Sequence, residues 1–466
     1  MTGSPPAVPS TRQQSLVIAC AASATYLAAS MGGSISLVLP QMAAALHSTA
    51  SEIQWIIVGY ILVRIAALRP AGTLCDQMGA KRIFIIGMGC FSLASALCAL
   101  VDSESVLIPL RMLQGGFAAV LSPSALVLLR QAIPEQRQVF AMGVWSAAGM
   151  AGFGLSPLFG GALVHAWGWQ AVFFFTAVLT LLMGIVAAAL IPKSETARPR
   201  PTQNRSVLHE LPASAALAGL AYVIGQPNTV GALGVGALIV ALASFIMIKH
   251  RRALGVGEWR PWLRIVPFVG IGVFGFAAIA GVMLWASYFI QRDLHLSAFA
   301  FGLACVPMAV GGMLAIFGTD ALVTAKRGNV AFLLGGAATV ALSVSAYWAE
   351  AASLVAVAGL TLMFAGLCYG FINASVTSGV MSAFASGQSG DASAIATLSK
   401  QFGQLLGIAV VATCRDFSGN SAGDDFRLFY FFGICGVVIT LCVGANAVVD
   451  TRRKQMSPQR AGQRST

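Results

Sequence analysis

A short polar stretch between two apolar segments contains residue types that could form a switch. It runs from Gly72 to Arg82 and combines glycines, a carboxylate and adjacent cations: Gly72, Asp76, Gly79, Lys81 and Arg82. Glycine permits a tight turn and a close approach of helices. The carboxylate can accept hydrogen bonds from a helix N-terminus or from basic side chains, and such contacts could lock one orientation of two bundles and break in another. The alternative interpretation is an ordinary charged loop, and the hairpin alone does not separate the two.

Three cations fall inside otherwise apolar segments: Arg64, Arg111 and Lys400. A charge at the centre of a bilayer costs at least about 2.5–3.5 kcal/mol on insertion scales, so it needs a partner or water. Arg111 is expected about 10 Å into its segment at 1.5 Å per residue. All sixteen Asp and Glu residues are expected at helix ends, in loops or in tails. No acid is therefore predicted opposite Arg111 or Arg64.

This excess of positive charge favours a pathway that attracts anions, or compounds that bear carbonyl or phosphate groups. In the alternative interpretation Arg111 ties helices together through backbone carbonyls, Arg64 extends to the interface, and Lys400 reaches cytoplasmic water. An enzyme is not expected, because the sequence has no H-E-x-x-H motif, no paired buried carboxylates and no P-loop. Without a P-loop, the energy for transport would come from a gradient.

The composition places these residues in a membrane protein. Of the 466 residues 57% are hydrophobic and only 9% are charged, whereas soluble domains carry about 25% charged residues. So few charges cannot cover a surface that faces water. The nine cysteines have no C-x-x-C spacing, so neither a metal site nor a disulfide framework is predicted. No cofactor is expected either.

The apolar segments are long enough for membrane helices, which need about 20 apolar residues. We count fourteen of them in a six, two, six pattern, which predicts an all-α polytopic protein. The first six are 15–40, 53–72, 82–101, 105–129, 139–164 and 170–192. The two middle ones are 208–226 and 229–248. The last six are 265–290, 297–322, 329–348, 352–380, 393–414 and 428–449. The expected parts are a disordered cytoplasmic N-terminus (1–14), a six-helix bundle (15–192), linkers with two inserted helices (193–264), a second six-helix bundle (265–449) and a cytoplasmic tail (450–466).

The distribution of Lys and Arg predicts the orientation, because cytoplasmic loops are enriched in both. With both termini in the cytoplasm, 21 of the 28 Lys and Arg residues fall on the cytoplasmic side. The formal net charge of +12 is therefore a topology signal and does not call for a nucleic-acid partner. We expect a multi-pass protein of the cell inner (plasma) membrane.

Four ordered elements resemble motifs of the major facilitator superfamily. The hairpin is similar to G-x-L-a-D-r-x-G-r-k, and the stretch from Arg111 to Ala119 is similar to R-x-x-q-G-x-g-a-a. The stretch from Gly149 to Gly161 resembles the antiporter motif g-x-x-x-G-P-x-x-G-G, and the stretch from Lys400 to Gly407 resembles r-q-l-G-g-a-l-G. With the six, two, six layout, these motifs point to the fourteen-span drug:proton antiporter branch.

The resemblance implies the major facilitator fold and the export of small amphipathic compounds, drugs or a toxic metabolite, by alternating access. Coupling to protons follows from the family alone. Two residues depart from the family pattern. Ser156 replaces a glycine of the antiporter motif, and Met31 stands where an acid is often found in the first helix. The other class considered is a carrier for a specific anion that uses Arg64 and Arg111.

Two groups of candidate residues follow from the motifs and the expected helices. The gating group consists of Gly72, Asp76, Gly79, Lys81, Arg82, Gly152, Pro157 and Gly161. The substrate or proton pathway group consists of Tyr60, Arg64, Arg111, Gln114, Trp145, Tyr288, Asn373 and Gln401. Each pathway residue could equally face lipid or form an interhelical hydrogen bond.

Overall fold

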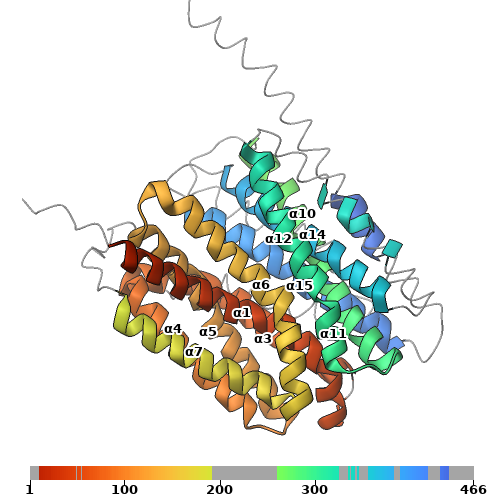
Figure 1. Cartoon of the computed structure of the whole chain (residues 1–466). Coiled ribbons are helices and arrows are strands. Elements are labelled where there is room, and N and C mark those ends of the chain that lie inside the picture. The colour runs from red at the N-terminus through yellow and green to blue at the C-terminus, as the bar shows by residue number, and fades with distance from the viewer. Residues whose placement is uncertain are drawn as a thin grey trace, which may run out of the picture. The chain divides into compact units, whose positions relative to one another are not determined.

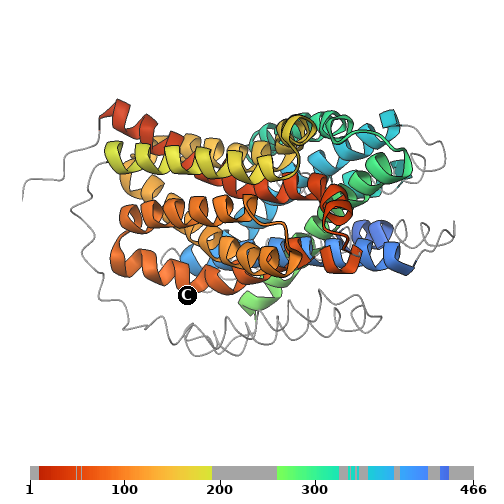
Figure 2. The same cartoon turned by 90° about the horizontal axis from the view of Figure 1, so that it is seen from below.

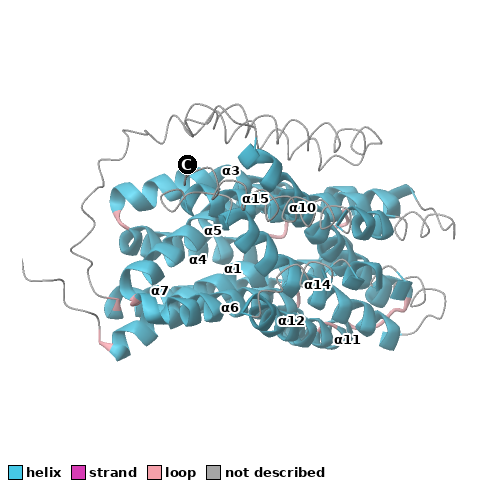
Figure 3. Cartoon of the chain, turned by 90° about the horizontal axis from the view of Figure 1, so that it is seen from above, coloured by secondary structure: helices cyan, strands magenta, loops and turns pink. Residues whose placement is uncertain are grey.

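The fold is all-helical wherever the structure describes it. The computed structural model describes residues 10–48, 50–53, 55–191, 260–324, 334–335, 337–341, 344–345, 355–382, 389–417 and 431–439. Within these ranges every regular element is a helix and none is a strand (Figure 3). The all-α expectation is confirmed.

The chain divides into two compact units. The first comprises Met1–Tyr222 with Ala286–Ala309, and the second comprises Val223–Trp285 with Val310–Thr466. We describe each unit by itself. The two inserted segments expected within 193–259 lie outside the described residues.

Seven helices of the first unit follow one another along the chain: α1 (Thr11–Ala45), α2 (Ala50–Ile53), α3 (Trp55–Met78), α4 (Ala80–Ala99), α5 (Glu104–Ala132), α6 (Glu135–Trp167) and α7 (Gln170–Leu190). The closest pairs are α1 with α6, α3 with α5, and α4 with α7 (Figure 1). Helix α1 also contacts α7, and Figure 2 shows these two helices in red and yellow. The π-helix η1 (Phe289–Asp293) and the short α11 (Ala298–Ala304) complete this unit, and α11 packs on α6.

Local signals in the sequence explain where several of these helices begin and end. Ser10 and Gln13 form a capping box at the start of α1, in which each side chain bonds to the other residue's backbone. Gly79 separates α3 from α4 with φ of 86°, and Gly168 separates α6 from α7 with φ of 80°. Glycine adopts these left-handed angles without the steric cost that other residues incur. Both turns therefore depend on the absence of a side chain.

The described helices of the second unit include α10 (Arg260–Tyr288, up to Trp285), α12 (Val306–Thr324, from Val310), α14 (Val355–Ser382) and α15 (Ser389–Phe417), and residues 337–341 and 431–439 are helical as well. Helix α14 packs on α15. Helix α10 also packs closely on α15, because a Cβ added to Gly403 or Gly407 would collide with backbone carbonyls of Val273 and Ala277.

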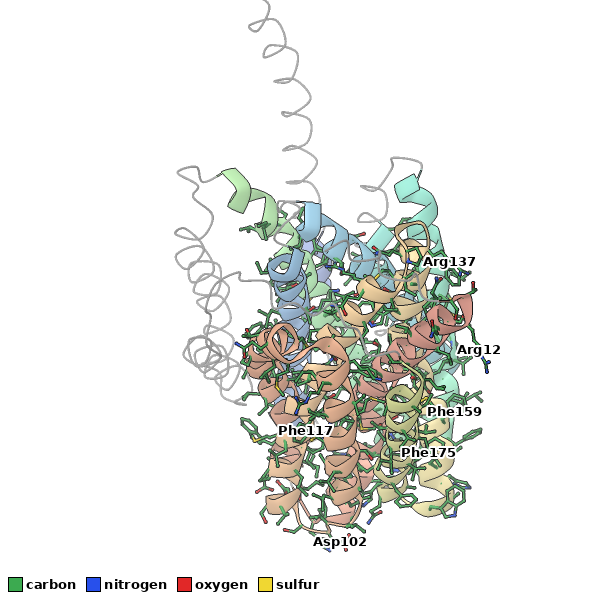
Figure 4. The ribbon with its side chains drawn as sticks, turned by 90° about the vertical axis from the view of Figure 1, so that its left-hand side faces the viewer. Arg12, Asp102, Phe117, Arg137, Phe159 and Phe175 are labelled. Carbon is green, nitrogen blue, oxygen red and sulfur yellow. The ribbon has the colours of Figure 1, made fainter. Side chains whose placement is uncertain are left out.

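Eight described helices are long and apolar enough to cross a membrane, and two shorter apolar helices cover Trp55–Leu68 and Ile395–Val411. Large apolar side chains remain exposed on the first unit, as Figure 4 shows for Phe159 and Phe175, which are 56% and 46% exposed. Exposed apolar surface of this kind suits contact with lipid. The six segments expected before residue 192 correspond to α1 and α3–α7. The count of fourteen stays a prediction, because several expected segments lie partly or wholly outside the described residues.

Charged side chains lie at the two ends of the first unit. Figure 4 shows Arg12 and Arg137 near one end and Asp102 at the other. Arg137 donates a hydrogen bond from Nη1 to Oε1 of Gln14 at 3.1 Å, which joins the starts of α6 and α1. The predicted orientation of the chain in the membrane stays a prediction.

Candidate functional site

The side chain of Arg111 lies fully buried in the middle of the first unit. Its Nε donates a hydrogen bond to the carbonyl oxygen of Ile56 at 3.1 Å, which connects α5 with α3. Its Nη1 donates to Oε1 of Gln114, one turn further along α5. The sequence could not decide whether Arg111 holds helices together or serves a pathway, and the bond to Ile56 shows that it performs at least the first task.

Gln114 extends this polar cluster to two more helices. Its Nε2 donates to Oγ of Ser95 on α4 at 2.6 Å and lies 3.8 Å from the sulfur of Met31 on α1. The same sulfur lies 3.8 Å from Nη1 of Arg111. Residues from α1, α3, α4 and α5 therefore meet at one buried point. We call Met31, Tyr60, Ser95, Arg111 and Gln114 the arginine cluster.

The ring of Tyr60 lies near both Arg64 and Arg111. The guanidinium carbon of Arg111 lies 4.5 Å from the ring centroid, and that of Arg64 lies 6.0 Å from it. Both distances suit a cation–π attraction. The hydroxyl of Tyr60 donates to the carbonyl oxygen of Ala28 at 3.3 Å and so ties α3 to α1. The predicted pathway residues Tyr60, Arg64, Arg111 and Gln114 are thus neighbours.

One nitrogen of the arginine cluster has no partner. Nη2 of Arg111 is buried and makes no hydrogen bond with the described residues. The groups that surround Arg111 are a carbonyl, an amide, a thioether and the rings of Tyr60 and Phe173. No carboxylate of the described residues bonds to it. A guanidinium has five N–H donors and a lasting positive charge, so this position can receive an acceptor that the described side chains do not supply.

The hairpin forms the predicted turn, and one of its cations has a partner that the sequence did not indicate. Helix α3 ends at Met78 and α4 begins at Ala80, so Asp76 occupies a helix end as expected; its side chain lies outside the described residues. Nζ of Lys81 donates to the carbonyl oxygens of Ala188 at 3.3 Å and of Ile191. Cations are favourable at a helix C-terminus, where carbonyls are left unpaired. Arg82 is exposed.

The close helix approach expected at Gly72 is wrong. A Cβ added there would meet no atom within 4 Å. Of the two hairpin glycines, Gly79 is the one whose positive φ the turn requires.

Helix α6 contains the antiporter-like stretch and makes close contacts at the predicted positions. A Cβ on Gly152 would collide with the carbonyl oxygen of Tyr26 on α1, and a Cβ on Gly161 would lie 2.7 Å from the carbonyl oxygen of Ala298 on α11. Pro157 lies inside α6, and its carbonyl faces Gly302 of α11 at a distance that leaves no room for a side chain. The small residues thus bring backbones together, as in other membrane bundles.

Ser156, which departs from the glycine of the motif, has a definite role. Its hydroxyl donates to the carbonyl oxygen of Ser30 at 3.1 Å, and the hydroxyl of Ser34 donates to the carbonyl oxygen of Ser156 at 3.2 Å. Both bonds are buried and join α1 to α6. The serine side chain supplies the first of these bonds, whereas the second uses a backbone carbonyl that a glycine would also have.

The remaining pathway residues are divided between the two units. Trp145 on α6 has a buried Nε1 without a partner among the described residues, and Tyr288 at the end of α10 is buried. In the second unit, Gln401 is buried with an unpaired Oε1, and Oδ1 of Asn373 accepts a hydrogen bond from Nζ of Lys400 at 2.7 Å. Lys400 thus has a protein partner that the sequence did not indicate, and the expectation that it reaches cytoplasmic water stays a prediction.

A second set of polar contacts, between α1 and the stretch that contains Ser287 and Gln291, was not predicted from the sequence. Oγ of Ser287 donates to the carbonyl oxygen of Ser36 at 2.6 Å, and Nε2 of Gln291 donates to that of Leu37 at 2.9 Å. Gln291 also donates to Oγ of Ser287 at 2.9 Å. These contacts fix the end of α10 and η1 to α1 within the first unit. The spacing of Ser287 and Gln291, one helical turn apart, was the available signal.

Comparison with known proteins decides the family. The sequence profile of the Major Facilitator Superfamily matches residues 18–408. The chain belongs to this superfamily. The resemblance drawn from the four motifs is confirmed, and the chain is a multi-pass membrane protein of a family of transporters.

Several relatives have names that describe resistance or efflux. A methylenomycin A resistance protein of Streptomyces coelicolor is 30% identical over 387 residues, which cover 79% of this chain and 78% of the relative. The multidrug efflux pump LfrA of Mycolicibacterium smegmatis is 31% identical over 304 residues, 63% of this chain and 59% of the pump. A tetracenomycin C resistance and export protein of Streptomyces glaucescens is 27% identical and covers 84% of this chain and 73% of its own length.

Proposed function

We propose that this major facilitator protein exports small amphipathic compounds, antibiotics or a toxic metabolite, across the plasma membrane. Export is coupled to proton entry and proceeds by alternating access. The resistance and efflux proteins among its relatives support the substrate class. Both termini lie in the cytoplasm, as the distribution of Lys and Arg indicates. The partners are the small-molecule substrate, protons and the lipid bilayer, with no role for nucleic acid.

The observation that carries the proposal is the arginine cluster. A fully buried arginine in a bundle of apolar helices is costly to keep, and charges at such depth usually mark a transport pathway. Arg111 is held by Ile56 and Gln114 while Nη2 stays unpaired. A held guanidinium with a free donor can bind a carbonyl or another acceptor of a substrate when the pathway opens. It can then return to its resting contacts without a protein carboxylate.

The test is drug susceptibility in a host that lacks its own efflux pumps. The wild type is compared with Arg111→Gln over a panel of amphipathic compounds that includes ethidium, with and without an uncoupler. We expect the wild type to confer resistance that the uncoupler abolishes and Arg111→Gln to confer little. Unchanged susceptibility to every compound in the wild-type strain contradicts the exporter proposal.

The hairpin supplies a separate test of the switch. Asp76 lies in the last turn of α3, before the Gly79 turn, and Asp76→Asn removes its charge with little change in volume. We expect wild-type amounts of Asp76→Asn in the membrane but poor export of ethidium. Asp102→Asn, the same change at an exposed acid outside the gating group, serves as the control. Full export by Asp76→Asn removes Asp76 from the gating group.

A carrier for a specific anion is the second candidate. The unpaired Nη2 of Arg111 and the nearby Arg64 favour it, since both guanidiniums lie against Tyr60. If it holds, Arg64→Gln abolishes the transport of an anionic compound. Undiminished export of cationic dyes by Arg64→Gln, with no anion transported by the wild type, excludes it.

A further inference from the structure

We propose that Lys400 is the residue that takes up and releases the coupling proton, and that Asn373 and Thr377 hold its amino group in both protonation states. The inference rests on the proposed proton antiport. It arises from an arrangement in the second unit, where the amino group of a lysine within an apolar helix bonds to two neutral oxygens.

Lys400 lies well inside its helix. It follows the start of α15 at Ser389 by about 16 Å at 1.5 Å per residue, and the apolar stretch Ile395–Val411 contains it. Its side chain is half-buried and directed to α14. A lysine at such a depth is rare in membrane helices unless it has a function.

The two oxygens that hold the amino group are both acceptors. Oδ1 of Asn373 lies 2.7 Å from Nζ of Lys400, and Oγ1 of Thr377 lies 2.8 Å from it. The hydroxyl of Thr377 donates its own hydrogen to the carbonyl oxygen of Asn373 at 2.8 Å. Its oxygen is thereby oriented to accept from Lys400. Asn373 and Thr377 are one helical turn apart, so α14 presents both oxygens on one face.

Counting donors shows why this arrangement suits proton exchange. An ammonium group has three N–H donors, and a neutral amine has two donors and a lone pair. Asn373 and Thr377 use two donors, so both bonds persist in either form. The third N–H has no acceptor among the described residues. Uptake of a proton forms this third bond from the lone pair, and release breaks it and returns the electron pair to nitrogen.

No described carboxylate holds the third proton in place. The described residues of α10 from Ile265 to Trp285 contain no titratable group. On α14 the titratable residues are Cys368, whose sulfur lies 3.1 Å from Oγ1 of Thr339, and Tyr369, whose ring packs on Phe276. Among residues 431–439 the only one is Cys435.

The neighbouring helices also carry acids and arginines. Asp391, Arg415 and Asp416 occupy positions near the two ends of α15, and Asp320 lies on α12, which packs on α14. The side chains of all four lie outside the described part of the chain. An ammonium that faces only neutral groups is costly away from water. The cluster therefore favours loss of the proton when the amine is shielded and its recovery when water returns.

Purified protein in liposomes provides the test, with ethidium as substrate and a pH-sensitive dye inside. With one proton exchanged for each ethidium, a gradient of one pH unit supports about a tenfold ethidium gradient. We expect the wild type to build up this tenfold ethidium gradient. Lys400→Arg keeps a positive charge but cannot release a proton, and Lys400→Gln has none. Both variants should still exchange labelled for unlabelled ethidium and should lose accumulation driven by the pH gradient.

A second measurement does not depend on transport. In weakly buffered detergent solution, ethidium binding should release protons from the wild type and none from either variant, while ethidium fluorescence reports binding. Proton release at the wild-type level by a variant that binds ethidium overturns the inference. So does gradient-driven accumulation by Lys400→Arg. If the wild type moves ethidium without moving protons, the proposed proton antiport itself is refuted. Failure of the Lys400 inference can thus be distinguished from failure of the antiport proposal.

Discussion

The sulfur of Met31 on α1 lies 3.8 Å from Nη1 of Arg111 on α5. This residue stands where the family often has an acid, so the buried guanidinium meets a thioether in place of a carboxylate. A thioether is a weak acceptor, and it cannot neutralise or titrate. The described contacts of this guanidinium are therefore with a carbonyl, an amide, a thioether and aromatic rings.

Arg111→Lys should fail although it keeps the charge. Lysine cannot bond to the carbonyl of Ile56 and to Gln114 in the same forked geometry. We expect export of ethidium to fall by at least about tenfold, which corresponds to about 1.4 kcal/mol. Arg64→Lys is the matched control, because Arg64 lies 6.0 Å from the ring centroid of Tyr60 in a cation–π contact that lysine can approximate. Equal export by both variants contradicts the special position of Arg111.

Ser156→Ala should destabilise the protein slightly and leave export largely intact. The change removes the bond to Ser30, and interhelical hydrogen bonds in membranes contribute about 0.6 kcal/mol on average. The described cysteines are free and, except for half-buried Cys90, buried, so a thiol-reactive dye reports thermal unfolding in detergent. A midpoint equal to that of the wild type shows that the hydroxyl does not stabilise the contact of α1 with α6.

Gly152→Ala and Gly72→Ala should have opposite effects. A methyl group at Gly152 collides with the backbone of Tyr26, whereas one at Gly72 meets nothing within 4 Å. Overpacking of this kind costs about 1–3 kcal/mol, and alanine in an open helix position gains up to about 1 kcal/mol over glycine. The thermal midpoint should fall for the first variant and stay or rise for the second. A lower midpoint for Gly72→Ala points to a contact absent from this structure.

Lys81→Gln should weaken the protein more than Arg82→Gln does. Lys81 bonds to the last carbonyls near the end of α7, and Arg82 is exposed. A cation at a helix C-terminus contributes about 0.3–1 kcal/mol, and salt screens the effect. The difference between the two midpoints should shrink at high salt. A difference that is absent at low salt rules out the bond to α7 as a stabilising contact.

The sequence predicted the positions of elements better than the partners of side chains. The turn between α3 and α4 follows from Gly79, and the depth of Arg111 follows from its distance along an apolar segment. Both depend on local sequence and on the rise of a helix. The bond of Lys81 to α7 joins residues more than a hundred positions apart, and hydropathy does not specify such a pair.

The same limit applies to Lys400 and Ser156. Composition indicates that a residue enters the membrane, but the rotation of its helix decides which neighbour it meets. Asn373 and Thr377 face Lys400 because α14 and α15 pack in one particular register. Gly72 shows the converse, since a residue matched to a motif has no close neighbour in this conformation.

The glycine contacts have a mechanical consequence. Gly115 lies against the backbone of Tyr60, Gly152 against that of Tyr26, and Gly407 against that of Ala277. Without an intervening layer of side chains, neither backbone can shift alone, because no rotamer change can absorb the displacement. Each of these helix pairs should therefore move as one rigid body. The pairs are α3–α5 and α1–α6 in one unit and α10–α15 in the other. Bending between such helix pairs should instead occur at short turns, such as the one at Gly79.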